Sequence, residues 1–193
     1  MRRVVLLAIL ALALPVAAFA NGIDFGNSTG TVKTNGSGGV TVTSVLKTVD
    51  GYGGLGNLAG VNLGSVSIVT GGVLSGSLAN GATLGPGTIT ITGNGSDGLP
   101  SGVLFSATFT SATWTLEPQL NGQNEYFLTA VFNNGSTFQT TFAIPGHGFF
   151  GGSASLASGD TQVNTVPEPG TLGLLGTGLV GIAGLVRRRL KIA

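Results

Sequence analysis

The sequence predicts an all-β fold: an antiparallel β-sandwich or barrel-like domain, flanked by two apolar end segments. Three observations support this. Between residues 21 and 165, apolar residues recur at every second position in short runs, which is the period of a half-buried strand. Glycine, asparagine and serine separate these runs at spacings typical of turns. No stretch in this region has the 3.6-residue period of an amphipathic helix. We therefore expect about eight to ten short strands.

The alternation is clearest in four runs, residues 40–47, 88–92, 126–132 and 138–144. Between the last two runs the sequence Asn-Asn-Gly at residues 133–135 supplies residues that tolerate positive φ. This is a strong signal for a tight turn between antiparallel strands. The two runs are therefore expected to form a hairpin.

One run changes its phase. Residues 103–109 place apolar side chains on one face, whereas Ala112, Trp114 and Leu116 continue the apolar side with a shifted phase. A one-residue shift moves every side chain to the opposite face, so a bulge or a strand break is expected near Ser111. The new phase places Trp114 in the core rather than on the surface.

The glycine-rich segment 51–85 admits two architectures. Its repetitive, glycine-rich composition is compatible with short solenoid turns, but the segment shows no fixed repeat period. A sandwich is therefore preferred over a solenoid.

Composition and charge exclude several classes of protein. Only 8% of the residues are charged, against about 25% in an average soluble domain. Between residues 21 and 165 two lysines, Lys33 and Lys47, stand against six carboxylates, so no basic surface is available for nucleic acid. The absence of cysteine excludes disulfides, thiolate metal sites and cysteine nucleophiles. Asp97 is a single carboxylate among turn residues, too few for calcium, so no metal and no cofactor is expected.

The N-terminal end has the order of a secretory signal peptide, residues 1–20. Arg2 and Arg3 precede an apolar run over residues 4–19. Ala18 and Ala20 form an A-x-A cleavage site, so the mature chain is expected to begin at Asn21. The expected partners here are the secretion machinery and signal peptidase.

The C-terminal end predicts a single transmembrane helix. Residues 171–186 carry no charge, and their helical length of about 24 Å is slightly short of a hydrocarbon core of about 30 Å. The cluster Arg187, Arg188 and Arg189 follows directly, can extend the span by snorkelling, and is expected to stay cytoplasmic. Everything before residue 170 is then outside the cytoplasm.

Val166, Pro167, Glu168 and Pro169 precede this helix, and the two prolines hold the segment extended. The order Pro-Glu-Pro, glycine-rich apolar helix and arginine cluster over residues 166–193 resembles the PEP-CTERM sorting signal. The resemblance implies recognition by an exosortase-type protease in a Gram-negative bacterium that produces exopolysaccharide. It also implies a transient inner-membrane anchor, cleavage near the motif, and delivery to the cell surface or the medium.

A second resemblance lies inside the β domain, residues 21–165. Residues 87–106, with the Thr-Trp-Thr sequence at 113–115, resemble a domain that recurs with this tail in short PEP-CTERM proteins. That domain has no assigned activity, so the resemblance supports the β fold and the compartment and implies no reaction.

Four side chains are of types that could take part in catalysis or sugar binding, and no catalytic residue is expected. His147 is the single histidine and stands in a loop sequence. Glu117 and Glu125 flank a predicted hairpin that can bring them near each other, the arrangement that a glycosidase would need. Tyr52 lies in a glycine-rich loop and is the expected exposed aromatic, hence a candidate contact for a sugar ring.

These observations favour a non-enzymatic surface or extracellular-matrix protein associated with exopolysaccharide or a biofilm. Two alternatives remain open: a carbohydrate-binding module of the same matrix, and a secreted hydrolase acting through Glu117 and Glu125. The low charge also predicts that an edge strand of the domain can self-associate, because few lysines protect it.

Overall fold

The computed structural model describes residues 22–118, 123–145, 152–164 and 178. Within residues 22–164 its described parts form ten strands and no helix, which confirms the predicted all-β class. Gly22–Thr165 is one compact unit. The two expected end helices fall outside the described residues. The strands are β1 (Gly22–Thr34), β2 (Val40–Asp50), β3 (Leu58–Thr70), β4 (Val73–Ser77), β5 (Gly81–Leu84), β6 (Gly87–Asn94), β7 (Ser101–Pro118), β8 (Gln123–Phe132), β9 (Thr137–Pro145) and β10 (Ser153–Asn164).

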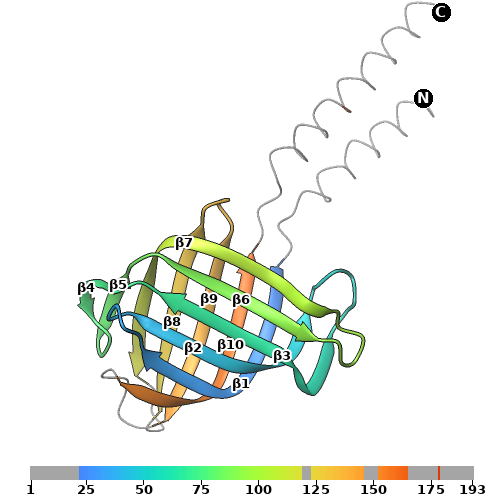
Figure 1. Cartoon of the computed structure of the whole chain (residues 1–193), viewed down its shortest axis with the longest axis horizontal. Helices are drawn as coiled ribbons and strands as arrows, with labels where there is room; N and C mark the ends of the chain where they lie inside the picture. The colour runs from blue at the N-terminus through green and yellow to red at the C-terminus, as the bar shows by residue number, and fades with distance from the viewer. Residues whose placement is uncertain (1–21, 119–122, 146–151, 165–177, 179–193) are drawn as a thin grey trace, which may run out of the picture. The chain divides into compact units, whose positions relative to one another are not determined.

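The sheet is a closed barrel, the second of the two predicted architectures. Every ladder is antiparallel, and the strands follow the order β4-β5-β7-β6-β3-β2-β1-β10-β9-β8. A further ladder between β7 and β8 closes eight of them into a ring, which Figure 1 shows in side view. The glycine-rich segment 51–85 contributes β3 and the β4–β5 hairpin, so it forms antiparallel strands rather than a solenoid.

The predicted change of phase is a β-bulge inside one long strand. Ser101–Phe109 of β7 pairs with β6, and the register to β8 shifts between Phe109 and Ala112. The two residues between them, Thr110 and Ser111, are exposed, while Phe109 and Ala112 are both buried. The bulge therefore keeps apolar residues inside on both sides of the shift and lets one strand pair with β6 first and β8 later.

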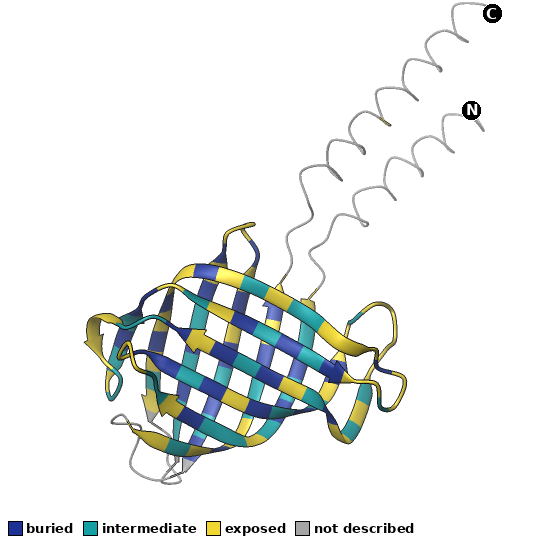
Figure 2. Ribbon diagram, in the orientation of Figure 1, coloured by how far each residue is buried: buried dark blue, intermediate teal, exposed yellow. Residues whose placement is uncertain are grey.

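The interior of the barrel is filled by side chains, and more and less exposed residues alternate along most of the barrel strands in Figure 2. Aromatic rings occupy one part of it. Trp114 stacks on Tyr126 at a centroid distance of 4.7 Å and lies 5.9 Å from Phe142. Phe132 stacks on Phe138 at 5.1 Å. Rings of this size contribute the largest share of buried apolar surface, and offset stacking adds about 0.5–1.5 kcal/mol per pair.

The predicted hairpin turn joins β8 to β9. Gly135 has φ +83°, the left-handed conformation that glycine adopts without strain. Its N–H donates to the carbonyl oxygen of Phe132 at 2.9 Å, and the N–H of Phe132 donates to Ser136 at 2.8 Å. The side-chain oxygen of Asn134 accepts from the N–H of Ser136 at 3.0 Å. The turn is therefore built by the residue types that predicted it.

Trp114 is fully buried, as its phase predicted, and it also anchors the β4–β5 hairpin. Its indole Nε1–H donates to the carbonyl oxygen of Leu78 at 2.9 Å. Leu78 lies in the turn between β4 and β5 and packs against the core. One side chain of the barrel wall thus fixes the tip of a hairpin that otherwise pairs only over residues 112–114 of β7.

Trp114→Phe removes this donor while keeping an aromatic ring in the core. We expect the free energy of unfolding to fall by about 1–3 kcal/mol, because the Leu78 carbonyl loses its partner. Hydrogen exchange of residues 73–84 should accelerate more than that of the barrel strands. Phe138→Leu is the matched control, since it also reduces core volume but leaves the hairpin anchor in place. Equal acceleration in both variants would contradict the anchoring role.

The β4 strand is the free edge of the sheet. It pairs only with β5, and all five of its residues are exposed, with Leu74 at 66%. The strand has no charged residue, and such an edge is an open template for another strand.

We expect Leu74→Lys to reduce concentration-dependent self-association, because an edge lysine opposes strand pairing. Sedimentation velocity over a concentration series measures this, with Val61→Lys on β3 as the control for added charge. A wild-type protein that stays monomeric throughout would refute the expectation.

Candidate functional site

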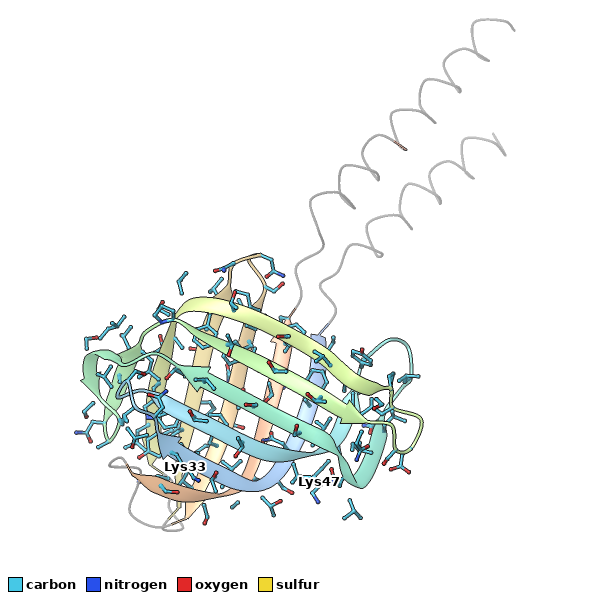
Figure 3. All side chains as sticks on the ribbon, in the orientation of Figure 1. Lys33 and Lys47 are labelled. Atoms are coloured by element: carbon cyan, nitrogen blue, oxygen red, sulfur yellow. The ribbon has the colours of Figure 1, made fainter. Side chains whose placement is uncertain are left out.

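The charged residues divide the barrel surface into two halves. Residues 51–116, which make up β3 to β6 and most of β7, contain a single charged residue, Asp97. The other charges of the described domain lie on β1, β2, β8, β10 and the end of β7. Its only two cations, Lys33 and Lys47, are on β1 and β2 (Figure 3). One half of the barrel is therefore neutral and the other is acidic.

A row of hydroxyl groups crosses the outer face from β1 into the neutral half. Thr31, Thr43, Ser67, Thr90 and Ser106 are successive register partners from β1 through β2, β3 and β6 to β7. Two neighbouring pairs are within hydrogen-bond range, Thr31 with Thr43 at 3.2 Å and Thr90 with Ser106 at 3.4 Å. Strand neighbours lie about 4.8 Å apart, so this row spans the outer face of the sheet with short uncharged side chains.

The outer face of β8 carries a different pattern, which we call the β8 patch. Tyr126 and Leu128 are fully buried, so the alternate residues of β8 point outward. The patch consists of these outward residues and their register partners on β7 and β9: Glu125, Phe127, Thr129 and Val131 on β8, Thr113, Thr115 and Glu117 on β7, and Thr137, Gln139, Thr141 and Ala143 on β9.

Phe127 is the central residue of the β8 patch. It is half-buried and pairs with Thr115 on one side and Thr141 on the other. It takes no part in the core cluster. A large aromatic ring on the outer face of a sheet, between two threonines, is the feature that the sequence analysis missed. The alternation of Tyr126, Leu128 and Ala130 already implied it, because the residue between two inward positions must point out.

A hollow of about 360 Å³ lies at one end of the β8 patch. The bulge residues Thr110 and Ser111 line it, together with Thr129, Val131 and Gln139. A second hollow of about 360 Å³ lies between the β4–β5 hairpin and β7 and contains Asn80 and Thr115 in its lining. The bulge thus shapes the surface beside the patch as well as the path of β7.

Three carboxylates meet at the ladders of β1. Asp24 is the register partner of Asp50 on β2. On its other side Asp24 pairs with Gln162 of β10, and Asp160 of the same strand lies diagonal to Asp24. Burial raises the pKa of Asp24 to about 7, with further contributions from its hydrogen bond to Asp160 and from the charges of Asp160 and Asp50. Protonated Asp24 is therefore favoured in the folded protein relative to the unfolded chain.

The direction of the resulting pH dependence follows from linkage. The stability that protonated Asp24 contributes is complete below its ordinary pKa near 3.8 and is lost as the pH rises through the folded-state pKa near 7. Above pH 7 the carboxylate of Asp24 is ionised and is repelled by Asp50 and Asp160. Solvent weakens this repulsion because the site is partly exposed.

Asp24→Asn should raise the melting temperature at pH 8 by roughly 2–4 °C, because screened repulsion at a partly exposed site is of the order of 1 kcal/mol. It should also flatten the fall in stability between pH 5 and pH 8. Calorimetric scans across this range test both effects, with Asp97→Asn in the loop after β6 as the control. An unchanged pH profile in Asp24→Asn would show that the three carboxylates do not interact.

The glutamates considered for hydrolysis do meet. Glu117 of β7 and Glu125 of β8 are direct register partners, as the predicted hairpin allowed. They stand on the outer face, Glu117 exposed and Glu125 half-buried, and neither lines one of the two hollows. The arrangement brings two carboxylates together on the outer face, outside the linings of the hollow beside the bulge and of the hollow beside the β4–β5 hairpin.

Tyr52 is less exposed than its glycine-rich loop suggested. It is half-buried, packs against the core, and its ring centroid is 6.5 Å from that of Phe25. It is partly exposed and stays a candidate contact. Asp97 has φ +54° in a turn where Asn94 accepts from the N–H of Ser96 at 2.9 Å. Among the described residues no group of three or more acidic or histidine side chains is arranged to hold a metal ion.

The predicted processing residues and His147 lie outside the described residues. These are Ala18, Ala20 and Asn21 at the signal cleavage site, Val166, Pro167, Glu168 and Pro169 at the sorting motif, and Arg187, Arg188 and Arg189 at the cytoplasmic anchor. In the described part of the chain there is no helix of the length and hydropathy that crossing a membrane requires.

The C-terminal end of the chain carries a known sorting signal. The family model of the PEP-CTERM protein-sorting motif matches residues 165–189, which contain the Pro-Glu-Pro sequence, the apolar segment and the arginine cluster. This motif implies export and membrane anchoring before processing by an exosortase system. No curated protein and no solved structure matches the chain.

Proposed function

We propose that the β domain is a non-enzymatic surface or extracellular-matrix protein that associates with exopolysaccharide once its sorting tail has been removed. The observation that carries this proposal is the PEP-CTERM motif at residues 165–189. A sorting signal of this kind delivers the domain to the envelope, where it can meet extracellular polysaccharide.

The barrel supports a binding role over a catalytic one. Its interior is occupied by aromatic and aliphatic side chains, so we expect a ligand to bind to the outer face of the barrel. Glu117 and Glu125 are adjacent on the outer face, away from both hollows. Catalytic acids usually act inside a concave site that excludes water and orients the substrate.

The surface chemistry supports a carbohydrate partner. The outer face from β1 to β7 presents a row of threonine and serine hydroxyls, and the β8 patch adds an aromatic ring, an amide and carboxylates. Hydroxyls and amides both donate and accept hydrogen bonds, as sugars do. The lack of a basic surface argues against anionic polymers such as nucleic acid.

The test follows the protein in a host that has the sorting protease and in a strain from which the protease is deleted. In the wild type we expect a mature chain that begins at Asn21, has lost the segment after Pro169, and co-sediments with the extracellular polysaccharide. In the deletion strain we expect the full tail and recovery with the inner membrane. Intact-mass spectrometry of each fraction identifies both ends.

Two results would count against the proposal. A tail that stays intact in both strains would remove the sorting step. A correctly processed protein that appears in the medium but never with the polysaccharide fraction would remove the association.

A further inference from the structure

From the geometry of the β8 patch we propose that it is a glycan-binding site, with Phe127 as its stacking platform, and that it binds extended polysaccharide without acidic groups. This inference rests on the proposed function and deepens it, since it names the binding face and the class of glycan.

The site is rigid because its strand is paired on both edges. Phe127 belongs to β8, which is hydrogen-bonded to β7 over residues 109–118 and to β9 over residues 137–145. The same pairing occupies both edges of β8, so a peptide cannot add to it as an extra strand. Ligands can reach this face only through side chains, which is how aromatic platforms hold sugar rings.

The ring of Phe127 is supported from behind and bordered at the sides. The neighbouring inward residues Tyr126 and Leu128 are fully buried and hold the strand against the core. Thr115 and Thr141 border the ring as its register partners. An apolar ring flanked by two hydroxyls matches a sugar, whose ring faces are apolar and whose rim carries hydroxyls.

The patch continues along the strand into the hollow. Outward residues of β8 follow one another at about 6.8 Å, so the run from Glu125 through Phe127 to Val131 is about 20 Å long. At its far end Val131 is 58% exposed and lines the hollow with Thr129 and Gln139. A track of this length suits several consecutive sugar units, with the ring near the middle and an amide and hydroxyls beyond it.

The charge of the patch selects against acidic glycans. Glu117 and Glu125 stand together at its near end. No lysine or arginine of the described residues lies on β7, β8 or β9, because Lys33 and Lys47 belong to β1 and β2. An approaching carboxylate or sulfate group therefore meets like charge, and the described residues of these three strands hold no lysine or arginine to offset it, whereas a neutral chain meets no such repulsion.

The experiment uses the processed protein purified from the host and three variants made in the full chain. Phe127→Leu keeps an apolar side chain but removes the flat ring, and Phe127→Trp keeps the ring. Val103→Ala truncates an exposed apolar residue on the β6-paired half of β7 and is the matched control. Affinity electrophoresis measures binding to the host polysaccharide, to a neutral galactomannan and to alginate as the acidic polymer.

We expect Phe127→Leu to weaken binding of the host polysaccharide and of the galactomannan about tenfold, while Phe127→Trp stays within about twofold of the wild type. Val103→Ala should bind as the wild type does, and alginate should not bind even at low salt. Unfolding curves of the four proteins show whether each variant is folded. If Phe127→Leu is not folded, Phe127→Thr replaces it, because threonine favours a strand and removes the ring, and the same tenfold loss is expected.

The outcomes separate the two proposals. If the wild type binds no polysaccharide, both polysaccharide association and this site are overturned. If the wild type binds and Phe127→Leu binds equally well, the association stands and the β8 patch is not its site. Preferential binding of alginate would overturn the stated glycan class.

Discussion

The ladder between the first strand and the last is the interaction on which the barrel depends. β1 and β10 pair along almost their whole length, from Gly22 with Asn164 to Lys33 with Ser153. No other ladder of the domain joins segments so far apart in the sequence. The conformational entropy of closing this loop must be overcome before the barrel gains its interior packing. The domain can therefore close only after its C-terminal strand has been synthesised and exported.

The β1–β10 ladder brings the first and last strands of the domain together at their outer ends. Gly22 and Asn164 are register partners, so both ends of the folded domain leave from neighbouring strands. The predicted signal cleavage site precedes Gly22 by a single residue, and the Pro-Glu-Pro sequence begins three residues after Asn164. Asp24 and Asp160 lie on opposite sides of the same ladder, so the pH dependence of stability acts on the strand pair that closes the barrel.

Much of the fold was predictable because it is encoded locally. The alternation of Tyr126, Leu128 and Ala130, the change of phase before Trp114, and the Asn-Asn-Gly turn are each readable within about ten residues. The closeness of Glu117 and Glu125 was also predictable, since a single hairpin joins them. These features were all confirmed.

The remaining features depend on pairings between distant segments. Nothing near Asp24 in the sequence indicates Asp160, which approaches it only because β1 pairs with β10. The need for glycine at some positions also depends on strand pairing. A Cβ on Gly30, for example, would lie 2.1 Å from the backbone oxygen of Thr43 on the neighbouring strand. The choice between sandwich and barrel likewise depended on a distant pairing, because the ring closes only when β1 pairs with β10, while the bulge lets β7 pair with both β6 and β8.

A filled barrel with its charges on one half is suited to weak, repeated contacts. Because β7, β8 and β9 hold no lysine, the polysaccharide binding that we propose would come from ring stacking and neutral hydrogen bonds rather than from counterion release. Single contacts of this type are modest, yet a polysaccharide presents the same unit many times. Many copies of the domain along one chain would then gain avidity through effective concentration rather than through a deep site. Retention in a matrix needs no more than this, which removes the need for a cavity inside the barrel.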